Sequence, residues 1–239
     1  FRNRICADTV LFFCRLVKEV SGGRLLSGSY FGYFLEHIPH ENLVRSGHIM
    51  LDRIVKDPSV DILCAPADYL FRMPDLPAGA MAPADTLRLH NKLWIQEDDI
   101  RGYLSKKSYM GRDNQYSHGK TDTPIDNVEL LRKQYAFNRA QGYGFWWYDL
   151  NGGWFNNAHI FQALLGRWVL REKESRYDKH QFDFPVEVAW VIDGYHSLYT
   201  RMTGVVPLAS RSQFKTFNRM PAPRDVIQLT DFRDCKLPE

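Results

Sequence analysis

The sequence of 239 residues lacks several features that would assign it to a class at once. Its apolar runs stay short of the roughly 18 residues that a membrane-spanning helix needs, so we expect no membrane segment. It has 31 basic and 28 acidic residues, and this small, scattered excess argues against a nucleic-acid partner. It contains no GxGxxG motif and no P-loop, so nucleotide binding has no support.

Cysteine is scarce, with four residues and no CxxC pair. Cys6 and Cys14 fall in a helical pattern and Cys64 in an apolar strand, so we expect buried free thiols rather than disulfides or zinc ligands. Free thiols point to a reducing compartment such as the cytoplasm, although the compartment stays open. The histidines match no zinc or HExxH spacing, and we expect neither a metal site nor a cofactor.

Apolar strands and helices do alternate regularly along the chain. We expect strands in 24–34, 58–66, 91–98 and 143–150, and helices over 5–20, 40–57, 123–142 and 156–174. This alternation predicts an α/β protein with a parallel sheet covered by helices, either doubly wound or a (β/α)8 barrel. The Pro- and Gly-rich segment 67–85 is too long for a bare connector, and such loops are usually functional.

The sequence changes character near residue 185. The stretches "FPVEVAWVID" and "RDVIQLTDF" are two further apolar strands that follow a charged stretch. We therefore expect a first domain over 1–184 and the beginning of a second α/β domain over 185–239. Because the first residue is Phe and the chain opens inside a helical pattern, we expect these residues to be part of a longer protein.

The third predicted strand, "KLWIQED", ends in acidic residues. Alternation along a strand places Leu93, Ile95 and Glu97 on one face. If that face points into a barrel, Glu97 is its last residue and stands at the mouth, where a carboxylate can serve in glycoside hydrolysis. A solvated turn would also place acids at this point, and spacing alone leaves both interpretations open.

Aromatic residues gather at two other strand ends. In "GFWWYDLNGGWF", Trp147 shares a face with Asp149, which suggests an apolar platform for a sugar ring beside a carboxylate for its hydroxyls. Packing of Trp147 between strand and helix is the alternative, and the sequence leaves both open. Trp154 follows in the loop and is a second candidate platform, whereas we expect Trp146 to pack in the core. Tyr30 and Tyr33, near the end of the first strand, are further candidates, with core packing as the alternative.

Taken in order, these stretches resemble the barrel of β-galactosidase-like glycoside hydrolases related to glycoside hydrolase family 42. The resemblance covers about residues 5 to 172 and is carried by runs over 28–37, 46–69, 79–101 and 142–155. It implies an α/β fold made of the C-terminal half of a (β/α)8 TIM barrel, its strands five to eight. The start of a flavodoxin-like trimerisation domain would follow, and the family habit suggests a homotrimer in the full-length protein.

The resemblance also implies a retaining hydrolase acting on an oligo- or polysaccharide, with Glu97 as nucleophile. Asp98, Asp99 and Arg101 would hold Glu97 or bind sugar hydroxyls. The family's acid/base glutamate, in an Asn-Glu pair on the fourth strand, would lie upstream of Phe1, so we expect the isolated chain to be inactive or poorly folded. The alternative is a non-catalytic carbohydrate-binding or scaffolding barrel that kept the aromatic residues.

Overall fold

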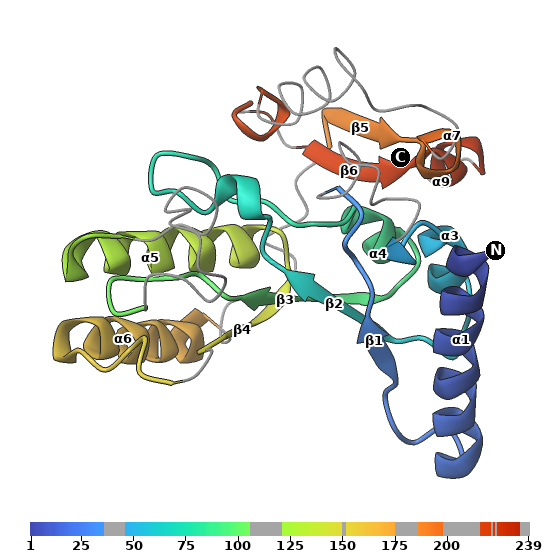
Figure 1. Ribbon diagram of the computed structural model, residues 1–239, viewed down its shortest axis with the longest axis horizontal. Coiled ribbons are helices and arrows are strands. Elements are labelled where there is room, and N and C mark those ends of the chain that lie inside the picture. The colour runs from blue at the N-terminus through green and yellow to red at the C-terminus, as the bar shows by residue number, and fades with distance from the viewer. Residues whose placement is uncertain are drawn as a thin grey trace. The chain divides into compact units, whose positions relative to one another are not determined.

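The computed structural model describes the residues 1–35, 46–105, 121–149, 152–174, 186–197, 216–220, 222 and 224–234 (Figure 1). The strands are β1 (Gly28–Tyr30), β2 (Ile62–Pro66), β3 (Leu93–Asp98), β4 (Gly144–Trp147), β5 (Val188–Ile192) and β6 (Arg224–Gln228). The helices are α1 (Arg2–Ser21), α3 (Leu51–Val55), the 3-10 turn η1 (Tyr69–Phe71), α4 (Asp85–Leu89), α5 (Pro124–Ala140), α6 (Ala158–Glu174), α7 (Gly194–Ser197) and α9 (Leu229–Arg233).

The strands form two sheets, one of four strands in the order β1-β2-β3-β4 and one that pairs β5 with β6. β1 and β2 are parallel, with Tyr30 opposite Cys64. β5 and β6 are also parallel, with Trp190 opposite Val226. Helices separate the parallel strands along the chain, because parallel neighbours need a crossover connection. The predicted mixed α/β class with parallel sheets is therefore confirmed.

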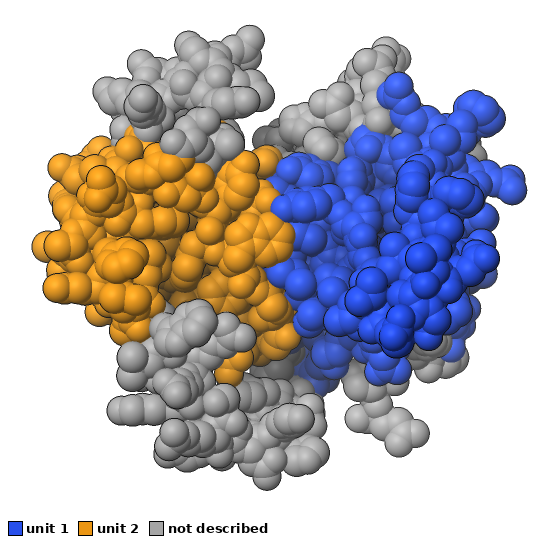
Figure 2. Space-filling model, turned by 90° about the horizontal axis from the view of Figure 1, so that it is seen from below, with its two compact units in different colours: residues 1–66, 80–96, 185–239 blue, residues 67–79, 97–184 orange. Residues whose placement is uncertain are grey.

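The chain divides into two compact units, drawn in different colours in Figure 2. Unit 1 comprises Phe1–Pro66, Ala80–Gln96 and Pro185–Glu239, and unit 2 comprises Ala67–Gly79 and Glu97–Phe184. The C-terminal segment from residue 185 thus clusters with the first residues of the chain. All the predicted site residues except Tyr30 and Tyr33 belong to unit 2.

Two predicted elements differ from the structure. The helix expected over 40–57 is interrupted after Ser46 and resumes as α3 at Leu51, because Gly47 has a positive φ of 86° that lies outside the α-helical region. Its first part, over 40–45, lies outside the described residues. The segment 67–85, expected as a long loop, contains the 3-10 turn η1, and the short helix α4 begins at Asp85. Neither η1 nor α4 has enough periodic apolar residues to be recognised in the sequence.

In unit 1, α1 ends where Gly22 takes a left-handed conformation with φ 60°, which glycine adopts at little cost. The helix buries Ala7, Leu11 and Cys14 and leaves Phe12 and Phe13 exposed. Neither α1 nor any other helix in the described part of the chain has both the length and the apolar character needed to cross a membrane.

In unit 2, α5 begins at a well-formed cap. The Thr123 side chain accepts a hydrogen bond from the Asp126 backbone N–H, and Pro124 occupies the first turn, where its missing N–H costs nothing. α5 and α6 lie side by side (Figure 1) and share a cluster of Val128, Leu131 and Ile160. Each such buried side chain contributes roughly 1.5–3 kcal/mol, so this cluster stabilises the packing of α5 against α6.

Candidate functional site: the carboxyl end of strand β3

Glu97 lies at the carboxyl end of β3 and is 8% exposed. Its backbone carbonyl accepts a hydrogen bond from the Ala67 N–H at 2.9 Å, which fixes the strand end. The next residue, Asp98, is fully buried and accepts a hydrogen bond from Asn138 Nδ2 of α5 at 2.6 Å. Asp98 therefore faces the helix, and alternation directs Glu97 to the opposite face of the strand.

The two faces of β4 follow from its aromatic contacts. Phe145 meets Tyr135 of α5 edge-on at 5.8 Å, and Trp147 packs against the cluster that α5 and α6 share. The face with Phe145 and Trp147 is thus the one covered by helices. Because successive strand residues alternate, Trp146 lies on the opposite face. The sequence pattern instead favours core packing for Trp146 and leaves Trp147 open between packing and a ligand.

The pairing of β4 with β3 brings Trp146 next to Glu97. The Tyr148 N–H donates to the Asp98 carbonyl at 3.2 Å. In the parallel β1–β2 pair, Tyr30 stands opposite Cys64, and the N–H of the next residue, Phe31, donates to the Cys64 carbonyl. By the same geometry Trp147 stands opposite Asp98 and Trp146 opposite Glu97. A carboxylate and an indole ring are therefore neighbours on the face of the sheet away from α5.

Asp99 is the third acid of the run, and it is held by Arg72. The two side chains form an ion pair, and Arg72 Nη1 also donates to the Asp99 carbonyl at 3.0 Å. Burial raises the pKa of Asp99 above its usual value, although Arg72 and Arg101 act in the opposite direction, and the charge of Glu97 raises it further. Glu97, Asp99 and the two arginines thus form one electrostatically coupled group.

A second cation, the partly buried Lys133 of α5, organises the segment Ala67–Gly79. Its Nζ donates to the backbone carbonyls of Phe71 at 3.1 Å and Leu76 at 2.8 Å, and also to that of Met73. Three acceptors satisfy the three N–H groups of the ammonium. Burial lowers the pKa of Lys133 to about 8, so the amine titrates slightly above neutral pH.

Asp149 and Trp154 are joined by a tight turn. The Asp149 carboxylate accepts hydrogen bonds from the Gly153 N–H at 2.9 Å and the Trp154 N–H at 3.1 Å. Gly152 and Gly153 both have a positive φ, of 75° and 90°, which residues with a side chain rarely adopt. Trp154 is 7% exposed and meets Tyr148 edge-on at 6.4 Å. Asp149 thus shapes the turn that places Trp154.

Tyr30 and Tyr33 belong to unit 1, at the carboxyl end of β1. Tyr30 is 53% exposed, whereas Tyr33 is half-buried and lies 5.5 Å from the ring of His48. His48 Nδ1 accepts a hydrogen bond from the Gly32 N–H at 3.2 Å, which fixes the orientation of its ring. The neighbouring Glu36 and His37 lie outside the described residues.

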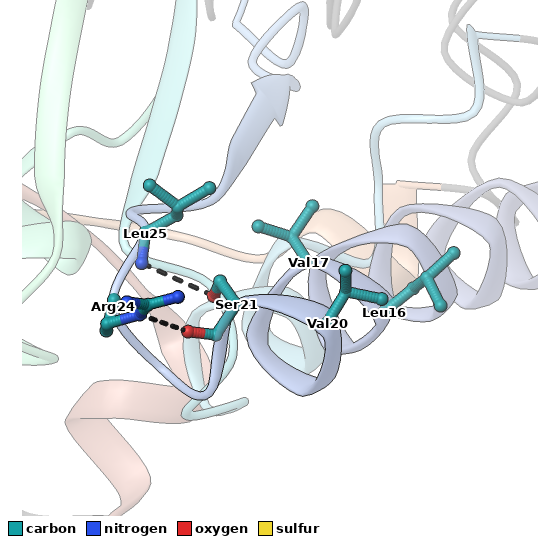
Figure 3. A pocket seen from close by; sticks show the side chains of 6 residues that line it. All are labelled: Leu16, Val17, Val20, Ser21, Arg24 and Leu25. Atoms are coloured by element: carbon teal, nitrogen blue, oxygen red, sulfur yellow. Dashed lines mark hydrogen bonds between the residues drawn. The ribbon is translucent and has the colours of Figure 1, made fainter.

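Metal ligands do not cluster anywhere in the described ranges, where no group of three His, Cys, Asp or Glu side chains could hold an ion. Cys14 and Cys64 are buried free thiols, as predicted, and Cys6 is free and partly buried. A groove of about 650 Å³ opens along the end of α1 in unit 1 (Figure 3). It is lined by Leu16, Val17, Val20, Ser21, Arg24 and Leu25 and contains none of the predicted site residues.

Sequence reasoning missed Arg72 and Lys133, the two cations that shape the turns of unit 2. Both are bound mainly by backbone carbonyls. Because every residue has a backbone carbonyl, such contacts cannot be recognised from the residue types in a sequence. The one usable signal was the length of the Pro- and Gly-rich segment 67–85, which marked this part of the chain as structured.

Comparison with known proteins adds no relative, since the chain matches no protein-family model, no curated protein and no solved structure.

Proposed function

We propose that the protein is a retaining, β-galactosidase-like glycoside hydrolase in which Glu97 is the nucleophile. In this proposal β1 to β4 correspond to strands five to eight of a (β/α)8 barrel, and the segment from residue 185 begins a flavodoxin-like domain. The observation that carries it is a shielded carboxylate, Glu97, at the carboxyl end of a sheet strand with an indole ring as its neighbour. Barrel enzymes place their catalytic groups at this end of the strands.

The reaction would run in two displacements. A Glu97 carboxylate oxygen attacks the anomeric carbon, and the bond to the leaving oxygen breaks while a second carboxylic acid, about 5 Å away, protonates that oxygen. The same group then takes a proton from water, which attacks the anomeric carbon and releases Glu97. We assign no residue of this chain to the second carboxyl group; in the family that the sequence resembles, a glutamate of an Asn-Glu pair on the fourth strand supplies it.

The other residues near Glu97 bind the substrate or support the strand ends in this proposal. Trp146 offers a flat apolar surface beside Glu97, on which the apolar face of a sugar ring can stack. Asp99 and Arg101 stay our candidates for binding sugar hydroxyls. Asp98 and Trp147 contact α5 and the cluster shared with α6, so we propose that they support the strand ends rather than touch the substrate.

Covalent labelling tests the nucleophile directly. The probe is a 2-deoxy-2-fluoro-β-galactoside that carries dinitrophenolate as its leaving group. Because dinitrophenolate departs without being protonated, the experiment does not depend on the proton donor. We expect the label on Glu97 by peptide mass mapping, in this chain or in a longer natural chain that contains it. Glu97→Gln should lower the labelling rate about 1000-fold or more, whereas Glu129→Gln, an exposed glutamate of α5, should not change it.

A label on another carboxylate would remove Glu97 from the role. Saturable binding of the galactoside without any covalent label would favour the alternative, a non-catalytic carbohydrate-binding barrel.

A further inference from the structure

Arg72 is the largest fully buried side chain among the residues that the structure describes, with none of its surface exposed. Removing a guanidinium from water is costly unless every donor finds a partner and the charge is compensated. A residue of this kind is therefore held in place by strong and specific contacts. Arg72 lies in the segment Ala67–Gly79, and some of its contacts are with Asp99, the first residue after β3.

The contacts of Arg72 come from the turn after β2 and the turn after β3. Nε and Nη2 both donate to the Ala67 carbonyl, at 3.2 and 2.6 Å. Nη1 donates to the Asp99 carbonyl at 3.0 Å, and Nη2 forms the ion pair with the Asp99 carboxylate. The guanidinium carbon lies 4.0 Å from the centre of the Tyr69 ring, a cation–π contact.

These contacts close a ring around Glu97. The Ala67 N–H donates to the Glu97 carbonyl, and the Ala67 carbonyl accepts from Arg72. Arg72 in turn holds both the backbone and the carboxylate of Asp99, two residues beyond Glu97. The backbone of Glu97 is thus fixed on both sides, through Ala67 before β3 in the sequence and through Asp99 after it.

The ring also balances charge. Glu97 and Asp99 are close enough for the charge of Glu97 to raise the pKa of Asp99, while Arg72 lowers it. Without Arg72, two carboxyl groups would share a poorly hydrated site, and one of them would hold its proton to higher pH.

We propose that Arg72 is a positioning residue for the reaction of Glu97: it fixes the Glu97 backbone through Ala67 and Asp99, and its guanidinium favours the ionised form of the Asp99 carboxyl group beside Glu97. The effect on reaction rate rests on the proposed function. The effect on the backbone does not, and the two are measured separately.

The backbone effect is measured by hydrogen exchange of the Ala67 amide, followed by NMR. We expect Arg72→Met to accelerate this exchange about 10-fold or more, because the carbonyl of Ala67 loses both of its donors from Arg72. Arg132→Met, the same change at an exposed arginine of α5, should leave it unchanged. Unchanged exchange in Arg72→Met would overturn the proposal whatever the protein's activity.

The rate effect is measured by the kinetics of labelling with the fluorinated galactoside. We expect Arg72→Met to lower the limiting labelling rate about 10- to 100-fold, with the half-saturating concentration changed less than about 3-fold. The acid limb of the pH–rate profile should move to higher pH. A weaker affinity with an unchanged limiting rate would instead indicate a substrate-binding role and overturn the positioning role.

The double variant Arg72→Met/Asp99→Asn keeps the test decisive if the single variant does not fold, because it leaves no uncompensated charge. It should return the acid limb to its wild-type position while the rate stays low, since the backbone ring remains broken. An acid limb that stays displaced in the double variant would overturn the charge-balancing part. If the wild type itself takes no label, the proposed function fails, and the exchange measurement still decides the backbone part.

Discussion

The turns around Asp57 and Asp231 in unit 1 are organised by buried carboxylates, whereas the segment Ala67–Gly79 in unit 2 is organised by the fully buried Arg72 and the partly buried Lys133. In unit 1, Asp57 accepts from Ser59 and pairs with Arg15. Asp231 accepts from Thr86 Oγ1 at 2.8 Å and binds His90 Nε2 at 2.8 Å. In unit 2, Arg72 and Lys133 donate to converging backbone carbonyls. The sign of the charge therefore matches the groups that it satisfies, hydrogen-bond donors around Asp57 and Asp231 and backbone carbonyls around Arg72 and Lys133.

The composition of the segment Ala67–Gly79 agrees with its use of cations. The segment Ala67–Gly79 contains Pro74 and Pro77, which carry a carbonyl but no N–H, so its backbone has more acceptors than donors. A cation supplies the missing donors. The turns of unit 1 around Asp57 present N–H and hydroxyl groups, which a carboxylate satisfies. Two chemically opposite side chains thus do the same structural task.

The largest change in the free energy of unfolding is expected for a substitution at Asp231. Asp231→Ala removes the acceptor of a buried hydroxyl and a buried imidazole, and we expect a loss of about 2–3 kcal/mol in the free energy of unfolding. Asp234→Ala, which breaks an exposed pair with Lys56, should cost less than about 1 kcal/mol. Urea unfolding at neutral pH measures both. Equal losses would show that burial does not set the strength of these contacts.

A smaller effect with a distinctive pH dependence is expected at Lys133. Its folded pKa of about 8 lies below the unfolded value of about 10.4. Between these values the unfolded chain binds more protons, so the stability of the wild type should rise with pH. Lys133→Met should lower the free energy of unfolding by about 1–2 kcal/mol at neutral pH. It should also remove the rise of stability with pH.

Urea unfolding of the wild type and Lys133→Met, at several pH values from neutral to about 10, measures the difference between the two curves. Lys92→Met changes a lysine of unit 1 that donates to the Asp57 carbonyl, and it should leave the rise in place. Parallel curves for the wild type and Lys133→Met would contradict the assignment.

The smallest effect is expected at low pH in unit 1. Burial opposes the ionisation of Asp57, but the hydrogen bonds from Ser59 and Arg15 outweigh it and lower the pKa of Asp57. Its contribution is therefore present above the unfolded pKa near 4 and is lost as the pH falls through the folded value. Asp57→Asn should lower the free energy of unfolding by about 1 kcal/mol at neutral pH and by less at pH 3. Urea unfolding at both pH values measures the difference. A cost independent of pH would show that the charge of Asp57 contributes nothing.

The sequence predicted the α/β class. Alternation along β3 places Leu93, Ile95 and Glu97 on one face, and that placement stays a prediction. Asp98 meets Asn138 on the helix side, as expected if Glu97 faces away. The faces of β4 could not be predicted in the same way. A parallel strand is apolar on both faces, so Trp146 and Trp147 look equivalent until the helices that cover one face are known.

Arg72 could not be predicted for a different reason. Its partners are a carbonyl five residues before it and a residue 27 positions further along the chain. No periodic pattern connects these positions, and the contact exists only once β2 and β3 are adjacent. A positioning residue of this kind is a property of the fold rather than of a motif.

Lys133 has one more consequence. Three carbonyls that converge on a single point are also the arrangement with which proteins bind potassium or sodium ions. Here the point is filled by an ammonium that is covalently attached to α5. The ammonium of Lys133 therefore occupies the position that a bound metal cation would take, and the conformation of the segment Ala67–Gly79 should not depend on whether the salt is a potassium or a sodium salt.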